Sequence, residues 1–252
     1  MIHFVGAGSG AADLITVRGA KLLEEADVVI YAGSLVNPAL LDYCHEGAQI
    51  HNSAHMTLEE VIAVMRDAEA QGLTTVRLHT GDPSLYGAHR EQMDLLDEAG
   101  IDYDVVPGVS SFSGAAAALK AEYTLPNVSQ SVIITRMEGR TPVPEGEKLR
   151  LMASHGCTMV LFLSTSLLDG AVEELLAGGY DADTPAAIVY KATWPDEQIF
   201  RCTVGTLAQT AREAGVKNTA LITIGGFLGS AYDRSRLYDP TFTHMFRQGT
   251  DD

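Results

Sequence analysis

Positive charge is scarce in this sequence. Lysine and arginine together number 17 against 33 aspartates and glutamates, and the formal net charge of the 252 residues is −16 at pH 7. Such a chain repels the phosphate backbone of a nucleic acid. We therefore expect no nucleic-acid partner.

Cysteine is also scarce, and long apolar runs are lacking. Cys44, Cys157 and Cys202 are odd in number and far apart, which argues against a disulfide framework and against a CxxC metal site. No apolar run reaches the roughly 20 residues that span a bilayer. Residues 1–5 have a strand pattern, with neither the basic region nor the cleavage site of a signal peptide. We expect a cytoplasmic protein with no membrane partner.

Two common kinds of catalytic motif are also missing. The sequence has no Gly-x-Ser-x-Gly nucleophile elbow. His51 and His55 stand four residues apart, but no third metal ligand has a matching spacing, so we expect no metal. The pair Ser110-Ser111 could hold a nucleophile, although a helix N-cap explains Ser110 by itself.

What the sequence does contain is a regular alternation of strand and helix patterns. In the first half this alternation is typical of a mostly parallel sheet with covered faces. The alternation restarts after Leu119, where a polar stretch (120–130) has the composition of a linker. We predict two α/β domains, residues 1–119 and residues 120–252.

Boundary signals place most of the individual elements. Thr57 and Glu60 form a capping-box pattern, and Gly72 ends the helix that it opens. The tail from Gly229 is polar and aromatic, and we expect it to be a surface extension. The expected strands are 2–5, 28–31, 74–78, 103–106, 131–135, 158–162, 186–190, 199–203 and 220–224. The expected helices are 16–26, 57–71, one with apolar spacing from Leu85, one from Ser110, one from Glu147, 167–176 and 207–214.

The loop after the third expected strand has the features of a ligand site. Strand 74–78 leads into Thr80-Gly81-Asp82-Pro83, and a helix pattern follows. Glycine lets backbone approach a ligand closely, and the carboxyl end of a strand is where open α/β sheets bind ligands. An ordinary Gly-Asp-Pro turn would look the same.

A second glycine-rich loop follows the first strand. Val5-Gly6-Ala7-Gly8-Ser9-Gly10-Ala11 can be aligned with the dinucleotide pattern G-x-G-x-x-G/A. That pattern also needs an acidic residue at the end of the second strand, to hold a ribose hydroxyl. The second strand ends at Tyr31-Ala32-Gly33, which disfavours a nicotinamide-dependent oxidoreductase.

Taken in order, four segments resemble the tetrapyrrole methylase family, S-adenosylmethionine enzymes of the class III methyltransferase fold. The resemblance covers nearly the whole chain, and the order and spacing of the segments make it specific. They are Val5-Gly6-Ala7-Gly8-Ser9-Gly10 with Leu14-Ile15-Thr16-Val17-Arg18-Gly19, Thr80-Gly81-Asp82-Pro83, Val105-Val106-Pro107-Gly108-Val109-Ser110-Ser111, and Thr219-Ala220-Leu221-Ile222-Thr223-Ile224-Gly225.

Three further segments resemble one branch of this family, the precorrin-4 C11-methyltransferases of cobalamin synthesis. They are residues 31–38, 51–60 and 135–142. One departure is Ser9-Gly10-Ala11-Ala12, where the family usually reads Pro-Gly-Asp-Pro. Other branches remain alternatives: another precorrin methyltransferase, a uroporphyrinogen-III methyltransferase or a diphthine synthase.

The resemblance implies a fold, a methyl donor and a set of donor contacts. The fold is two α/β domains, each a mixed, mostly parallel sheet flanked by helices, with S-adenosyl-L-methionine folded in the cleft between them. A homodimer is also implied. By motif, the donor contacts in the first half are Ser9, Thr80, Gly81, Asp82, Leu85, Ser110 and Ser111. Those in the second half are Leu163, Gly205 and Ala220.

The implied reaction moves a methyl group from a sulfonium to a carbon of an anionic tetrapyrrole. Because the donor is already activated, positioning can supply most of the catalysis, and no single acid or base is required. The candidate catalytic residues are Asp82, Tyr86, His79 and Arg136, and Tyr31, Ser34 and Met137 are further candidates for shaping the macrocycle site. An acidic protein needs a local positive rim for this substrate. The candidates for the rim are Arg90, Lys120, Arg136, Arg140 and Lys191.

Overall fold

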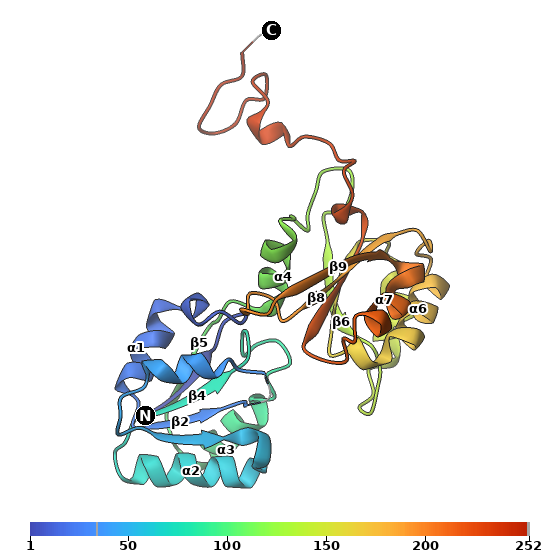
Figure 1. The fold of residues 1–252 in the computed structure, drawn as a ribbon. Coiled ribbons are helices and arrows are strands. Elements are labelled where there is room, and N and C mark those ends of the chain that lie inside the picture. The colour runs from blue at the N-terminus through green and yellow to red at the C-terminus, as the bar shows by residue number, and fades with distance from the viewer. Residues whose placement is uncertain (34, 251–252) are drawn as a thin grey trace. The chain divides into compact units, whose positions relative to one another are not determined.

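The computed structural model describes residues 1–33 and 35–250. The chain folds into two compact units, and we describe each by itself (Figure 1). The first unit comprises Met1–Ala117 and Lys191–Glu197, and the second comprises Ala118–Tyr190 and Gln198–Asp252. Residues 191–197 thus belong to the first unit, although they are remote from it in sequence. The predicted division into residues 1–119 and 120–252 does not include this exchange.

The first unit is built on a five-stranded sheet in which every pairing is parallel. β1 lies at an inner position between β4 and β5, so the ends of these three strands meet at one edge. The strand order is β3 (Gln49–Asn52), β2 (Val28–Tyr31), β4 (Thr75–His79), β1 (Ile2–Gly6) and β5 (Tyr103–Val106). β3 was not predicted, because it is short and mostly polar and pairs only at the edge of the sheet.

Helices cover both faces of this sheet (Figure 1). Alternate residues of β1 face opposite ways: Val5 belongs to the apolar cluster of α1, whereas Phe4 belongs to the cluster of α2 and α3. The capping box of Thr57 and Glu60 is present, which confirms the predicted start of α2. These helices are α1 (Val17–Glu25), α2 (Leu58–Ala70) and α3 (Arg90–Ala99). α4 (Ser111–Leu119) follows β5, and the division between the two units falls within it.

The helix predicted from Leu85 begins later than expected. α3 starts at Arg90, and the preceding residues form a loop in which Tyr86 and Ala88 have φ angles of 56° and 48°. Such positive φ angles are incompatible with a right-handed helix. A Cβ on Gly87 would lie 2.1 Å from the carbonyl oxygen of Pro83, so this loop folds back on itself. The apolar spacing of Leu85 and Ala88 continues the period of α3 without continuing its backbone.

The second unit contains a mixed five-stranded sheet. Only β6 and β7 pair in parallel, and the other three pairings are antiparallel. This confirms the mixed α/β class and the predicted β8–β9 pair, although the sheet is less parallel than expected. The order is β6 (Val132–Arg136), β7 (Thr158–Phe162), β10 (Ala220–Ile224), β8 (Pro185–Tyr190) and β9 (Gln198–Thr203).

Three helices bury the apolar face of the second sheet. Met159, Leu161, Ile188 and Ile222 are fully buried there, together with Leu175 of α6. The helices are α5 (Leu149–Ala153), α6 (Leu168–Ala177) and α7 (Leu207–Glu213). Across both units, no helix within the described ranges is long and apolar enough to cross a membrane.

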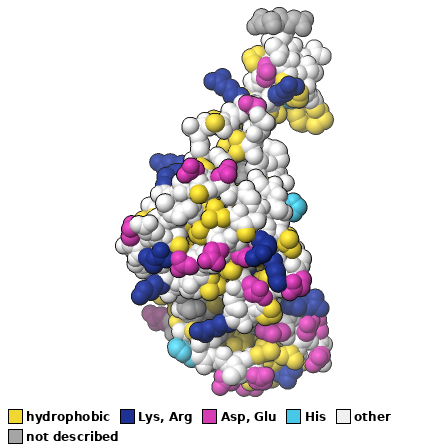
Figure 2. All heavy atoms as spheres, turned by 90° about the vertical axis from the view of Figure 1, so that its right-hand side faces the viewer, with side chains coloured by type: hydrophobic (Ala, Val, Ile, Leu, Met, Phe, Trp, Pro, Cys, Tyr) yellow, Lys and Arg dark blue, Asp and Glu magenta, His cyan; other side chains and the backbone are white. Residues whose placement is uncertain are grey.

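The tail beyond Gly229 lies at the surface, as expected. Within the tail, Arg247 donates to the carbonyl oxygens of Leu237 and Asp239, so the tail folds back on itself. Large apolar side chains stay exposed along it, including Tyr238, Met245 and Phe246. Figure 2 shows such hydrophobic groups near the C-terminal end, while acidic and basic side chains are interspersed over the face in view.

Candidate functional site

Three loops meet at the carboxyl edge of the first sheet. They follow β1 (7–11), β4 (80–84) and β5 (107–110). The amide of Ala7 donates to the carbonyl oxygen of His79 at 2.7 Å, and Gly8 and Gly81 exchange two backbone hydrogen bonds of 3.2 and 3.1 Å. The first two loops are therefore joined by backbone groups.

Glycine is required where these loops touch. A Cβ on Gly108 would lie 2.1 Å from the carbonyl oxygen of Gly81, and a Cβ on Gly6 would lie 2.5 Å from the Cα of Gly108. Gly81 also has a φ of +62°, which L side chains rarely adopt. The glycines quoted from the sequence thus let three loops approach with no side chain between them.

Asp82 fastens the β4 loop to the β5 loop. Its Oδ2 accepts from the amide of Gly108 at 2.8 Å, and its Oδ1 accepts from the amide of Ser84 at 2.9 Å and from the Ser84 hydroxyl. Burial raises the pKa of the Asp82 carboxyl, but the hydrogen bonds from Ser84 and Gly108 outweigh that effect and lower the pKa overall. The carboxylate is therefore already engaged with this chain's own donors.

We predict that Asp82→Asn destabilises the protein by about 1.5 kcal/mol, because one of the two carboxylate oxygens becomes a donor that faces another donor. Asp94→Asn is the matched control, since Asp94 pairs with Arg90 on the surface and such pairs contribute little. Urea unfolding of the two variants measures the difference. Equal stability of Asp82→Asn and the wild type would contradict the role of Asp82 as a fastener.

Behind the β4 loop lies a buried group of charged and aromatic side chains. Arg77 donates from Nε to Oε1 of Gln92 at 3.1 Å and from Nη1 to the carbonyl oxygen of Ile30 at 3.2 Å. The His79 ring stacks on Phe4 and lies beside His89, with ring centroids 5.9 and 5.5 Å away. Its Nε2 is buried without a hydrogen-bond partner among the described residues.

Electrostatics keep His79 neutral. Burial is the main reason why its pKa falls from 6.5 to about 3, and the neighbouring Arg77 and His89 lower it further. Burial also lowers the pKa of Arg77, to about 10, which still leaves the guanidinium charged at neutral pH. Because His79 is 3% exposed and uncharged, it supports the loop from inside the core.

This neutral histidine predicts a specific loss of stability in acid. Between pH 6.5 and pH 3 the unfolded chain binds one proton more at His79 than the folded chain, so the free energy of unfolding falls as the pH drops. From pH 7 to pH 5 this amounts to about 2 kcal/mol. Urea unfolding at the two pH values should show a decrease that is smaller by this amount in His79→Phe. The same pH dependence in both proteins would rule the prediction out.

The other predicted residues of the first unit lie around the joined loops. Thr80, Leu85 and Ser111 are half-buried, and Ser110 is buried just before α4, where its carbonyl oxygen accepts from the amides of Ser113 and Gly114. Tyr86 is 45% exposed on the loop before α3. Tyr31 ends β2 and is half-buried. Ser34 lies outside the described residues.

Ser9 is held by a segment that sequence reasoning missed. Its hydroxyl lies 3.1 Å from that of Thr193, which belongs to the tip of the β8–β9 hairpin (191–197). The sequence identifies this tip only as a turn at Pro195-Asp196. No local pattern signals a contact across 184 positions of the chain.

In the second unit, two predicted donor contacts lie together and the third does not. Leu163 follows β7 and is 60% exposed, and Ala220 begins β10, the antiparallel neighbour of β7. Ala220 pairs with Tyr190 at one end of β8. Gly205 follows Thr203, which pairs with Pro185 at the other end of β8. The length of a strand therefore separates Gly205 from Leu163 and Ala220.

Arg136 is committed to its own loop. Its guanidinium donates to the carbonyl oxygens of Pro142 at 2.7 Å and Thr141 at 3.2 Å, so it fixes the chain that follows β6. Met137 beside it donates its amide to the hydroxyl of Ser164. Arg140, on the same loop, is exposed, and no described residue bonds to its guanidinium.

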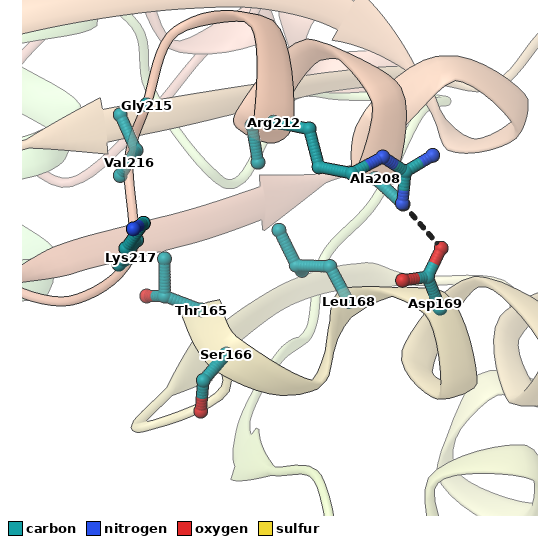
Figure 3. Close-up of a pocket in the computed structure, with 10 residues that line it drawn as sticks. Thr165, Ser166, Leu168, Asp169, Ala208, Arg212, Gly215, Val216 and Lys217 are labelled. Carbon is teal, nitrogen blue, oxygen red and sulfur yellow. Dashed lines mark hydrogen bonds and ion pairs between the residues drawn. The ribbon is translucent and has the colours of Figure 1, made fainter.

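A separate pocket of the second unit contains none of the predicted residues. It lies where the 3₁₀ turn Thr165–Leu167 and the start of α6 face the end of α7, and an ion pair of 2.6 Å between Arg212 and Asp169 closes one side (Figure 3). Within 1–33 and 35–250, no group of three or more histidines, cysteines or acidic residues is arranged to hold a metal ion.

One family model matches most of the chain. The model of the tetrapyrrole (corrin/porphyrin) methylases matches residues 1–208. The chain therefore belongs to the tetrapyrrole methylase family, as the sequence motifs predicted.

Individual relatives match over almost their whole length. The chain is 55% identical over 248 residues to a cobalt-precorrin-4 C(11)-methyltransferase from Methanocaldococcus jannaschii, with 98% of this chain and 96% of the relative covered. It is 47% identical over 248 residues to a precorrin-4 C(11)-methyltransferase from a Sinorhizobium species, with 98% of each covered.

Two solved structures share the fold. A cobalt precorrin-4 methyltransferase superposes with a TM-score of 0.89 at 49% identity, covering 91% of this chain and 96% of the other. A uroporphyrin-III C-methyltransferase from Thermus thermophilus, complexed with S-adenosylhomocysteine, superposes with a TM-score of 0.78 at 26% identity, covering 90% and 98%.

Proposed function

We propose that this protein transfers a methyl group from S-adenosyl-L-methionine to C11 of precorrin-4 or cobalt-precorrin-4 in cobalamin biosynthesis. The observation that carries the proposal is the identity of 47–55%, over almost the full length, to relatives with this activity in their names. The uroporphyrin-III C-methyltransferase from Thermus thermophilus is less similar, at 26% identity. An assay of both macrocycles with methyl-labelled donor tests the proposal and decides which form is the substrate.

The joined loops of the first unit are the proposed donor-binding element. Ser9, Thr80, Gly81, Asp82, Leu85, Ser110 and Ser111 all lie on them or beside them. Backbone fixed by glycine contacts and by Asp82 can receive a ligand without reordering, which lowers the cost of binding. Leu163 and Ala220 remain predicted contacts. We leave Gly205 out because it lies at the other end of β8.

In this reaction the residues need to position the donor and the acceptor, and proton transfer matters less. A sulfonium methyl group is activated before it binds, so holding donor and acceptor in line supplies much of the rate. The methyl transfer also removes the positive charge of the sulfur, which a site with little water favours. A neutral, buried His79 fits this scheme as a support. The family resemblance adds a homodimer, and the composition and ligand spacing of the sequence add a cytoplasmic location and a reaction without a metal cofactor. All three stay predictions.

We predict one binding site per chain for S-adenosylhomocysteine in the presence of a chelator. Calorimetric titration measures it, and titration with NADH under the same conditions is the control that tests the oxidoreductase alternative. Heat with NADH and none with S-adenosylhomocysteine or S-adenosylmethionine would remove the methyltransferase proposal.

The anionic macrocycle still needs positive charge from an acidic protein. Of the rim candidates, Arg90 pairs with Asp94 at 2.7 Å and Lys191 pairs with Asp196 at 2.6 Å. Arg136 bonds to its own loop. The exposed Arg140 is therefore the candidate that we favour for binding a substrate carboxylate. Arg136 holds the loop that carries Arg140.

We predict that Arg140→Gln raises the apparent KM for the macrocycle about fivefold at low salt, because a screened charge pair is lost, and that it weakens the salt dependence of KM. The matched control is Arg18→Gln, which removes another exposed arginine, from α1. Donor affinity should be unchanged in both variants. A KM that changes equally in both variants would reflect net charge alone and would place the rim elsewhere, with Lys120 next.

A further inference from the structure

The hairpin tip (191–197) binds the glycine loop at two points. Oγ1 of Thr193 lies 3.1 Å from Oγ of Ser9 and accepts from the amide of Ala11 at 3.0 Å. Ser9 is 7% exposed. One hydroxyl thus fixes both a predicted donor contact and the backbone two residues beyond it.

Glycines at the two positions that contact Ser9 and the hairpin tip leave space for them. A Cβ on Gly10 would lie 2.2 Å from Cδ1 of Trp194 and 2.5 Å from the carbonyl oxygen of Ala192. On α4, which follows the predicted contacts Ser110 and Ser111, a Cβ on Gly114 would lie 2.6 Å from the Cβ of Ser9. The same position is 3.2 Å from Cγ2 of Thr193. Two glycines therefore leave room for Ser9 and the tip to pack together.

The backbone of Thr193 is strained in order to present the hydroxyl. Its φ is +67°, which is rare for any side chain and especially unfavourable for a β-branched one. The turn is braced against this strain: the Thr193 amide donates to Oε2 of Glu197 at 2.6 Å, and Lys191 pairs with Asp196. Glycine would fit this backbone without strain, but it would bond to neither Ser9 nor Ala11. Residues held in such conformations by their surroundings cluster at functional sites.

We propose that Thr193 is a positioning residue for the methyl donor, and that it acts through Ser9 and the Ala11 amide to hold the glycine loop in its ligand-binding conformation. This inference rests on the proposed function. The loop is tied on its other side by the Gly8–Gly81 bonds. Thr193 therefore completes its fixation, and a loop fixed before binding costs the ligand less ordering entropy.

The test compares Thr193→Val with Thr193→Ser by calorimetry with S-adenosylhomocysteine. Valine keeps the β-branched shape and the strain but removes the hydroxyl, whereas serine keeps the hydroxyl. We expect Thr193→Val to raise Kd about tenfold and Thr193→Ser to change it by less than about twofold. The matched control is Thr210→Val on α7, which removes a hydroxyl that donates to the Thr206 carbonyl oxygen and should leave Kd unchanged.

Kinetics and melting temperature distinguish a positioning role of Thr193 from a purely structural one. With saturating donor, kcat of Thr193→Val should stay near the wild-type value while KM for the donor rises. A lowered Tm with an unchanged Kd would overturn the proposal and leave Thr193 a purely structural residue. If the valine variant does not fold, Thr193→Ala carries the same test without the β-branch. If the wild type binds neither S-adenosylmethionine nor S-adenosylhomocysteine, the proposed function fails, and this inference fails with it.

Discussion

The approach of three loops without intervening side chains is the constraint on which the rest of the first unit depends. Gly6, Gly81 and Gly108 bring backbone within contact distance, and the Gly8–Gly81 pair turns that approach into hydrogen bonds. Asp82 adds a charged acceptor for the amide of Gly108. A parallel sheet makes this possible, because β1, β4 and β5 deliver their carboxyl ends to one edge. Any side chain added at Gly108 would separate the loops.

The basic side chains near these loops are either buried or already paired. Arg77 and His79, near the end of β4, turn inward, and the first keeps its charge while the second loses it. Among the residues of the predicted rim, Arg90 and Lys191 pair with neighbouring carboxylates, and Arg136 bonds to a carbonyl oxygen. An acidic enzyme for an anionic substrate thus leaves few cations to bind it, and for this reason we predict that Arg140 contributes to substrate binding.

The sequence predicted what depends on local patterns. The inner strands, the capped helices and the order of motifs follow from periodicity and end signals, and the fold class and family were correct. The late start of α3 could not be seen, because Leu85 and Ala88 keep a helical spacing on a backbone of positive φ. The placement of Gly205 needed the strand register, which no single motif contains. The Ser9–Thr193 contact needed the tertiary structure itself.

The Ser9–Thr193 contact can form only late in synthesis of the chain. Ser9 emerges from the ribosome 184 residues before Thr193, a delay of roughly ten to forty seconds at ordinary elongation rates. The strands of the first sheet are all complete by then, so the nascent chain can form its core while the glycine loop still lacks one of its ties. The last hydrogen bonds of the loop thus form only after at least 193 of the 252 residues have been made.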